Sequence, residues 1–117
     1  MLDLSENNIS NIDILDKVNF KELKKLSFYS NYITDIKVLE NVKFEKLELL
    51  SLGENGISNI DILDKVNFKK LKKLYLFENK ISDIKVLENV KFEKLELLDL
   101  RKNIINLEQN KLILYQK

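Results

Sequence analysis

The side chains that most often carry catalysis and metal binding are missing from this chain. Its 117 residues include no Cys and no His, which excludes thiolate chemistry, zinc thiolate sites and imidazole bases. Ser, Lys, Asp and Glu remain as nucleophiles and bases, but none of them lies in a nucleophile elbow, a phosphate-binding loop or a metal-binding motif. The sequence therefore predicts a non-enzymatic protein with no metal and no cofactor.

One set of carboxylates does recur at a regular spacing. Its members lie 24 residues apart and are Asp16, Glu40, Asp64 and Glu88. A calcium ion needs several oxygen ligands that converge on one point, and nothing in the sequence indicates such convergence. We interpret these carboxylates as a solvent-exposed acidic face.

The composition of the whole chain is that of one globular domain. Hydrophobic residues make up 44% and charged residues 33% of the sequence, a balance typical of folded proteins. The net charge of +1 gives no field that would attract nucleic acid or an anionic membrane. No signal peptide and no apolar run long enough to span a bilayer is visible. We therefore expect no nucleic acid, no membrane and, by default, a cytoplasmic location.

A repeat of 24 residues dominates the sequence. Residues 71–84, LKKLYLFENKISDI, have the skeleton LxxLxLxxNxIxxI, and a fixed period in this range is typical of solenoid proteins. Several columns of the skeleton recur together. They are Leu2, Leu26, Leu50, Leu74 and Leu98; Leu4, Phe28, Leu52, Leu76 and Leu100; Asn7, Asn31, Asn55, Asn79 and Asn103; and Ile9, Ile33, Ile57, Ile81 and Ile105.

This skeleton resembles the leucine-rich repeat family over nearly all of the chain, and the repeat length is similar to that of the shorter, internalin-like class. The resemblance implies an α/β fold, a right-handed leucine-rich repeat solenoid with a concave parallel β-sheet. Its convex side would consist of 3₁₀ turns or short helices. In the family the fixed Asn residues form a ladder, and an amide at this position can bond backbone groups of its own repeat and of a neighbour.

The spacing of apolar residues within a repeat predicts the same elements. The alternation Leu74-Tyr75-Leu76 predicts a short strand. The spacing of three between Ile84, Leu87 and Val90 favours a 3₁₀ turn, which Ser82 or Asp83 would cap. We expect Phe20, Phe44, Phe68 and Phe92 to stack. The predicted single domain covers residues 1–117: a partial first repeat 1–22, repeats 23–46, 47–70 and 71–94, and a degenerate last repeat with a C-terminal cap, 95–117.

A second period of 48 residues overlies the first, because two repeat types alternate. It creates three columns of alternating charge, listed here: Asp13, Lys37, Asp61 and Lys85; Lys21, Glu45, Lys69 and Glu93; Lys24, Glu48, Lys72 and Glu96. Strands about 4.8 Å apart would place opposite charges side by side. Such pairs either help to fix the register of the repeats or are the passive result of a duplication.

Protein binding in such an array is expected on the outward side chains of the concave sheet. Several of these positions hold apolar or aromatic residues among basic ones, a composition typical of interfaces. The predicted partner-binding residues are Lys25, Tyr29, Leu49, Lys73, Tyr75, Phe77, Leu97, Asp99 and Arg101. The alternative is that neighbouring Lys stems cover Leu49 and Leu97.

The two ends of the array give a second functional hypothesis. The chain begins on Leu2 and Leu4 without a polar cap, so the first repeat would face solvent or a partner. We expect one of three explanations: a fragment of a longer leucine-rich repeat protein, self-association through this face, or fraying. After Ile105 the skeleton is lost, and Leu107, Leu112, Leu114 and Tyr115 are predicted to fold over the last repeat as a cap.

Overall fold

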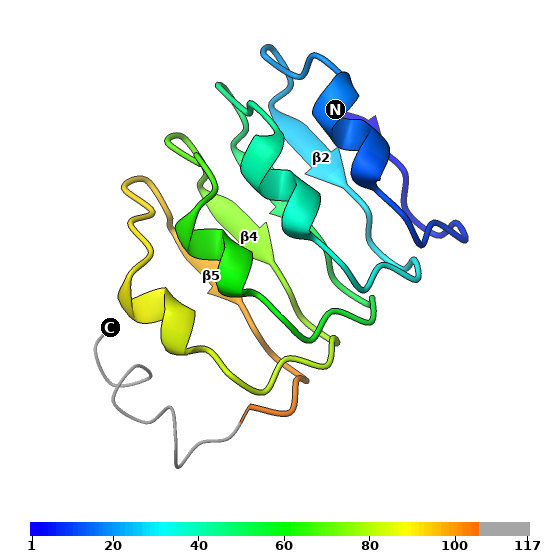
Figure 1. The fold of residues 1–117 in the computed structure, drawn as a ribbon, viewed down its shortest axis with the longest axis vertical. Helices are drawn as coiled ribbons and strands as arrows, with labels where there is room; N and C mark the ends of the chain where they lie inside the picture. The colour runs from blue at the N-terminus through cyan, green and yellow to red at the C-terminus, as the bar shows by residue number, and fades with distance from the viewer. Residues whose placement is uncertain (106–117) are drawn as a thin grey trace.

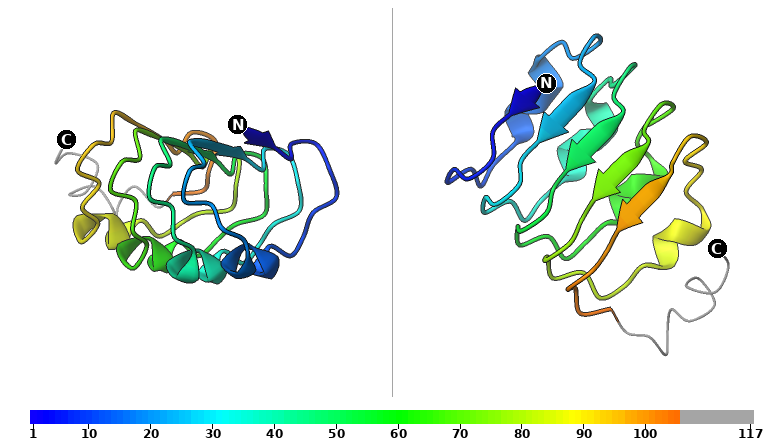
Figure 2. Two further views of the ribbon diagram at one scale, coloured as in Figure 1. Left: turned by 90° about the horizontal axis from the view of Figure 1, so that it is seen from above. Right: turned by 180° about the vertical axis from the view of Figure 1, so that it is seen from behind.

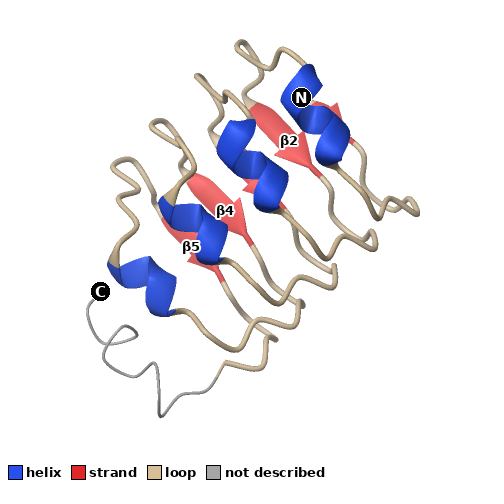
Figure 3. Ribbon diagram, in the orientation of Figure 1, coloured by secondary structure: helices blue, strands red, loops and turns tan. Residues whose placement is uncertain are grey.

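The computed structural model describes residues 1–105, which form two layers (Figure 1). One layer is a parallel β-sheet and the other is a row of 3₁₀ helices, with loops joining the layers at both sides (Figures 2 and 3). No helix in the described part of the chain is long and apolar enough to cross a membrane. The predicted cap at Leu107, Leu112, Leu114 and Tyr115 lies outside the described residues.

The sheet contains one short strand from each repeat, in the order of the sequence. The strands are β1 (Leu2–Asp3), β2 (Lys25–Ser27), β3 (Leu49–Ser51), β4 (Lys73–Tyr75) and β5 (Leu97–Asp99). Every pair is parallel, and each register step is one repeat, as in Leu26↔Leu50 and Leu50↔Leu74. The sequence period therefore sets the register, and the predicted leucine-rich repeat solenoid is confirmed.

The second layer confirms the prediction of 3₁₀ turns. Its helices are η1 (Asp13–Lys17), η2 (Lys37–Asn41), η3 (Asp61–Asp64) and η4 (Lys85–Glu88). Asp83 accepts a hydrogen bond from the Lys85 backbone N–H at 2.9 Å, which satisfies a donor at the start of η4. Asn11, Asp35 and Asn59 make the same bond in the other repeats.

The apolar columns of the repeat meet between the two layers. Leu26, Leu50 and Leu74 are completely buried beneath the sheet, because alternate side chains of a strand point to opposite faces. The predicted stack of Phe rings is present. Successive ring centroids are 5.9 Å apart for Phe20–Phe44, 5.8 Å for Phe44–Phe68 and 6.3 Å for Phe68–Phe92.

The fixed Asn residues tie each repeat to the one before it. The Asn79 carboxamide oxygen accepts from the Ile57 N–H at 3.0 Å, and its Nδ2 donates to the Leu52 and Leu76 carbonyls, both at 3.0 Å. Asn31, Asn55 and Asn103 make equivalent bonds. Asn79 is buried, so these residues have the supporting role that the sequence predicted.

The residue before each of these Asn adopts a left-handed backbone conformation. The φ values are 56° at Glu6, 61° at Ser30, 52° at Glu54, 53° at Glu78 and 59° at Lys102. None of these residues is Gly, the residue that adopts this conformation at least cost. The turn after each strand is therefore fixed by the Asn bonds and not by local preference. It places the Glu6–Glu54–Glu78 column beside the outward face of the sheet.

The charge columns pair less regularly than the alternation predicted. Of the three columns, only the one with Glu48 and Lys72 shows an ion pair among residues 1–105, at 4.0 Å. A shorter ion pair, Lys46–Glu22 at 2.8 Å, joins two neighbouring repeats outside those columns. Both lie at the surface, where such pairs contribute about 0–1 kcal/mol. The loops, which hold these long side chains loosely, set the pairing in place of the column positions.

Candidate functional site

The predicted binding residues lie on one surface, the outward side of strands β2 to β5 and the residues that follow them, which we call the sheet face. Lys25, Leu49, Lys73 and Leu97 pair with one another along the start of the strands. Tyr75 pairs with Asp99 at their ends. Tyr29, Phe77 and Arg101 follow two residues after the strand ends. The structure thus places the predicted residues side by side.

Three aromatic rings form a cluster at the centre of the sheet face. The Tyr29 and Phe77 rings are 5.8 Å apart, centroid to centroid, and tilted by 40°. The Tyr75 ring meets Phe77 edge-on, at 6.2 Å and 88°. All three side chains are half-buried. Because aromatic pairs in these geometries attract one another beyond simple burial, the rings hold each other in place.

Gly53 makes the contact between Tyr29 and Phe77 possible. It occupies the position between them in the column, one repeat from each. A Cβ on Gly53 would lie 2.6 Å from the Phe77 ring atoms Cε1 and Cζ. The Phe77 ring therefore fills the space that Gly53 leaves open. The φ of Gly53 is not positive, so the lack of a side chain matters here and not backbone freedom.

The hydroxyl of Tyr29 is fixed by a carboxylate of the neighbouring turn. It donates a hydrogen bond of 2.6 Å to Oε2 of Glu54. This bond raises the pKa of Tyr29 above its ordinary value, with smaller contributions from partial burial and from the charges of Glu54, Glu78 and Glu6. Tyr29 is thus a neutral, oriented ring beside carboxylates at neutral pH.

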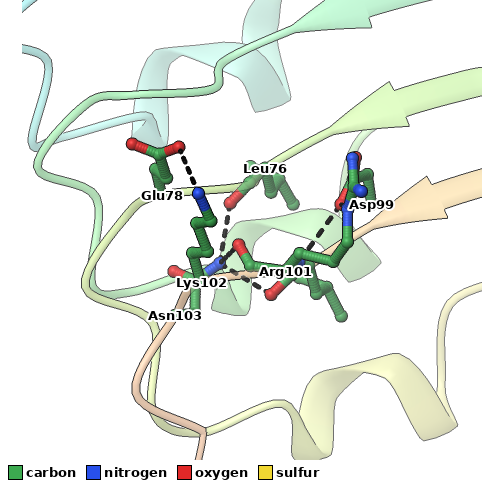
Figure 4. A network of polar contacts seen from close by, with 7 residues as sticks. Leu76, Glu78, Asp99, Arg101, Lys102 and Asn103 are labelled. Carbon is green, nitrogen blue, oxygen red and sulfur yellow. Dashed lines mark hydrogen bonds and ion pairs between the residues drawn. The ribbon is translucent and has the colours of Figure 1, made fainter.

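Arg101 and Asp99 form a bidentate pair next to the aromatic cluster (Figure 4). The Arg101 Nε donates to Asp99 Oδ1 at 2.9 Å, and its Nη2 donates to Oδ2 at 2.8 Å. The hydrogen bond from Arg101 lowers the pKa of the Asp99 carboxyl below its ordinary range. The Asp99 side chain is 6% exposed and that of Arg101 82%. Asp99 therefore orients Arg101, and Arg101 presents the charge to solvent.

The start of the strands carries a shallow, mixed surface. Its lining residues are Lys25, Glu48, Leu49, Lys72, Lys73 and Glu96. Leu49 is half-buried among these side chains, as the alternative of covering Lys stems anticipated, whereas Leu97 is 39% exposed. Leu97 is thus the more accessible apolar side chain of this column.

The expected exposure of the outward columns fails at several small or polar positions. Ser27, Ser51, Gly53 and Asp99 are buried although they point away from the core. Ser27 is covered because its hydroxyl bonds Ser5 Oγ at 2.8 Å, and Gly53 because Phe77 lies over it. A small residue flanked by aromatic residues one repeat away was the only signal in the sequence for this arrangement.

Metal chemistry finds no support in the described part of the chain. Residues 1–105 contain no group of three or more Asp or Glu side chains placed to hold a metal ion. The acidic column, including Glu40 and Asp64, is exposed beside the 3₁₀ helices.

Comparison with known proteins agrees with the geometry. A family model described as leucine-rich repeats, two copies, matches residues 45–89, which include β3, η3, β4 and η4. The chain is a leucine-rich repeat solenoid. Leucine-rich repeat proteins generally mediate protein–protein interactions. A search of curated proteins gave no match.

Two solved structures similar to this solenoid are internalins from Listeria monocytogenes. One, an internalin (inlF), is 30% identical with a TM-score of 0.70, and the match covers 91% of this chain and 29% of that one. The other, internalin C2 (inlC2), is 30% identical with a TM-score of 0.74, and the match covers 90% of this chain and 43% of that one. The chain therefore spans less than half the length of these internalins.

Proposed function

We propose that this solenoid is a non-enzymatic module that binds a protein partner on its sheet face. The aromatic cluster of Tyr29, Tyr75 and Phe77 carries this proposal. Aromatic side chains and Arg are enriched among the residues that contribute most to interface energy. Here the three rings and Arg101 lie together on a regular sheet, where their partners in the fold already restrict them. Binding to such a surface loses little side-chain entropy.

The remaining predicted residues extend the surface along the strands. Lys25 and Lys73 are exposed, and Leu97 is partly so. They surround the start of β2 to β5 with basic and apolar groups, while the aromatic cluster occupies the strand ends. A partner that crosses both regions would bury the rings at its centre and leave the Lys side chains at the rim.

A pull-down with the paired substitution Tyr75→Ser and Phe77→Ser tests the proposal. We expect the variant to recover at least tenfold less partner, because loss of two interface aromatics costs on the order of 2 kcal/mol or more. Tyr32→Ser together with Ile104→Ser provides the matched control, since both side chains are about two-thirds exposed, at 66% and 65%, and lie outside the sheet face. Undiminished recovery with the first variant would disprove the proposal.

The surface offers no arrangement for catalysis among residues 1–105. The carboxylates beside the rings serve as acceptors for Tyr29 and Arg101, and no Ser or Lys there bonds a carboxylate that would act as its base. The leucine-rich repeat fold of internalin type is typically non-enzymatic. A binding module is the function that this geometry supports best.

A further inference from the structure

The charges beside the aromatic cluster are unevenly balanced across the sheet. On the side of β4 and β5, Lys102 pairs with Glu78 at 3.6 Å (Figure 4). Arg101 likewise neutralises Asp99 at 2.8 Å. On the side of β1 to β3, no basic side chain of residues 1–105 forms an ion pair with Glu6 or Glu54. The carboxylates around Tyr29 therefore keep an excess of negative charge.

The Tyr29 ring lies within this excess charge. Its hydroxyl is held 2.6 Å from the Glu54 carboxylate, and its ring leans against Phe77. The raised pKa of Tyr29 reflects the field of Glu54, Glu78 and Glu6 together. The face of an aromatic ring is itself the negative end of its quadrupole. Ring faces and carboxylates thus favour the same kind of ligand, a cation.

We propose that the partner inserts a Lys or Arg side chain at this corner of the sheet face, with its charge between Glu54 and Glu6 and its alkyl stem on the Tyr29 and Phe77 rings. This proposal rests on the proposed function and names the chemistry of the partner. An acidic partner residue would meet like charges here. A purely apolar one would bury the Glu54 carboxylate without a counter-charge, which is costly. Cation–π contact and charge pairing reinforce each other only for a basic side chain.

The test uses two synthetic peptides, hexalysine and hexaglutamate, added to the 117-residue chain and followed by NMR at low salt. We expect hexalysine to shift the resonances of Tyr29, Glu54 and Phe77 and hexaglutamate to leave them in place. The shifts should fade with added salt, because the surface carboxylates are screened. Hexalysine shifts spread evenly over the acidic column of Glu40 and Asp64 would overturn the proposal.

Matched variants separate the corner from acidity in general. Glu54→Gln keeps the size and an acceptor for Tyr29, and we expect it to weaken hexalysine binding about two- to fivefold, the range of an exposed cation–π or ion-pair contact. Glu40→Gln removes the same charge beside η2 and should leave the affinity unchanged. Tyr29→Leu removes the ring and should weaken binding, whereas Tyr29→Phe should preserve it. Equal effects of Glu54→Gln and Glu40→Gln would contradict the proposal, and amide spectra of each variant show that it is folded.

The two proposals fail in different ways. If Tyr75→Ser with Phe77→Ser abolishes partner recovery and Glu54→Gln does not reduce it, the sheet face binds a protein but not through a cation at this corner. If the aromatic variant recovers the partner normally, the proposed function is wrong, whatever the peptides do.

Discussion

Gly53 controls how the largest side chain of the sheet face lies. The Phe77 ring occupies the position of the missing Gly53 Cβ, and from there it reaches Tyr29 in the repeat beyond. The contact thus spans two repeats, farther than neighbouring strands alone would bring equivalent side chains. A single methyl group at Gly53 would separate the two rings.

The substitution Gly53→Ala should reverse its sign with the partner ring. In the native chain we expect it to destabilise by about 1 kcal/mol, since it displaces Phe77 and breaks an aromatic pair. In a Phe77→Ser background the added methyl meets no ring, and we expect stabilisation of about 0.5 kcal/mol, the usual effect of Gly→Ala at a compatible site. Urea unfolding of the four proteins measures both values as a double-mutant cycle. The same ΔΔG in both backgrounds would contradict the assigned contact.

The Asp99–Arg101 pair predicts a dependence of stability on pH. The pKa of Asp99 is lower in the folded chain than in the unfolded chain, so its contribution to stability is present above about pH 4 and is lost as the pH falls through the folded value. Asp99→Asn cannot lose this contribution on acidification. We therefore expect the stability advantage of the native chain over Asp99→Asn, measured by urea unfolding from pH 6 to pH 2, to shrink below about pH 4. A constant difference would show that the carboxylate charge is not involved.

The turns between elements depend on the Asn ladder more than on any other polar group. Asn79 holds the buried Ile57 N–H, for which no other hydrogen bond is recorded. The carbonyls that Asn79 also bonds have second donors: Leu52 O accepts from Asn55, and Leu76 O accepts from Asn103. The ladder is therefore continuous, and its loss at one position leaves mainly an amide without a partner.

Asn79→Ala should lower the free energy of unfolding by about 2–3 kcal/mol, the cost of leaving a buried donor unsatisfied. Asn59→Ala is the matched control. Asn59 is exposed and bonds only the Asp61 N–H at the start of η3, so we expect a loss of about 1 kcal/mol or less. Urea denaturation at equilibrium measures both. Equal losses for the two variants would be inconsistent with a supporting ladder.

Much of the fold could be predicted from the sequence because its determinants repeat. The column of Leu74 and the column of Asn79 fix the register and the turns, and the spacing of Ile84, Leu87 and Val90 indicated the 3₁₀ layer. The left-handed turn at Glu78 had no such signal, since Glu does not favour that conformation and the Asn bonds impose it. The ion pair of Glu22 with Lys46 was missed because flexible exposed side chains do not follow column positions.

The binding surface was predictable only in outline. The outward positions of Tyr29, Tyr75 and Phe77 follow from strand alternation and the repeat register. The direction in which each ring leans depends on its neighbours' volumes, so the contact of Phe77 across Gly53 required the structure. The binding of a partner at these residues stays a prediction.

Across residues 1–105 every repeat packs only on the repeats beside it, and the sheet, the Phe stack and the Asn ladder all cross each boundary. No boundary between repeats in this range lacks these contacts. Neighbour coupling of this kind in a short array favours unfolding as one unit.

We therefore expect a single urea transition with the same midpoint by tyrosine fluorescence and by far-UV circular dichroism. Asn31→Ala and Asn79→Ala, which weaken different boundaries, should both move this midpoint without splitting the transition. Separate midpoints for the two probes would mean that the repeats unfold independently.

The Phe column also determines how the molecule bends. Equivalent atoms of successive repeats are about 4.8 Å apart in a β-sheet, but the Phe20, Phe44, Phe68 and Phe92 rings repeat every 5.8–6.3 Å. Each repeat is thus a wedge, thinner at the strands than at the rings, and stacked wedges form an arc with the sheet on its inner radius. Outward side chains of neighbouring strands lean together along that arc. Trimming the Phe rings would open the arc and draw Tyr29, Phe77 and their carboxylates away from a rounded partner without altering any of them.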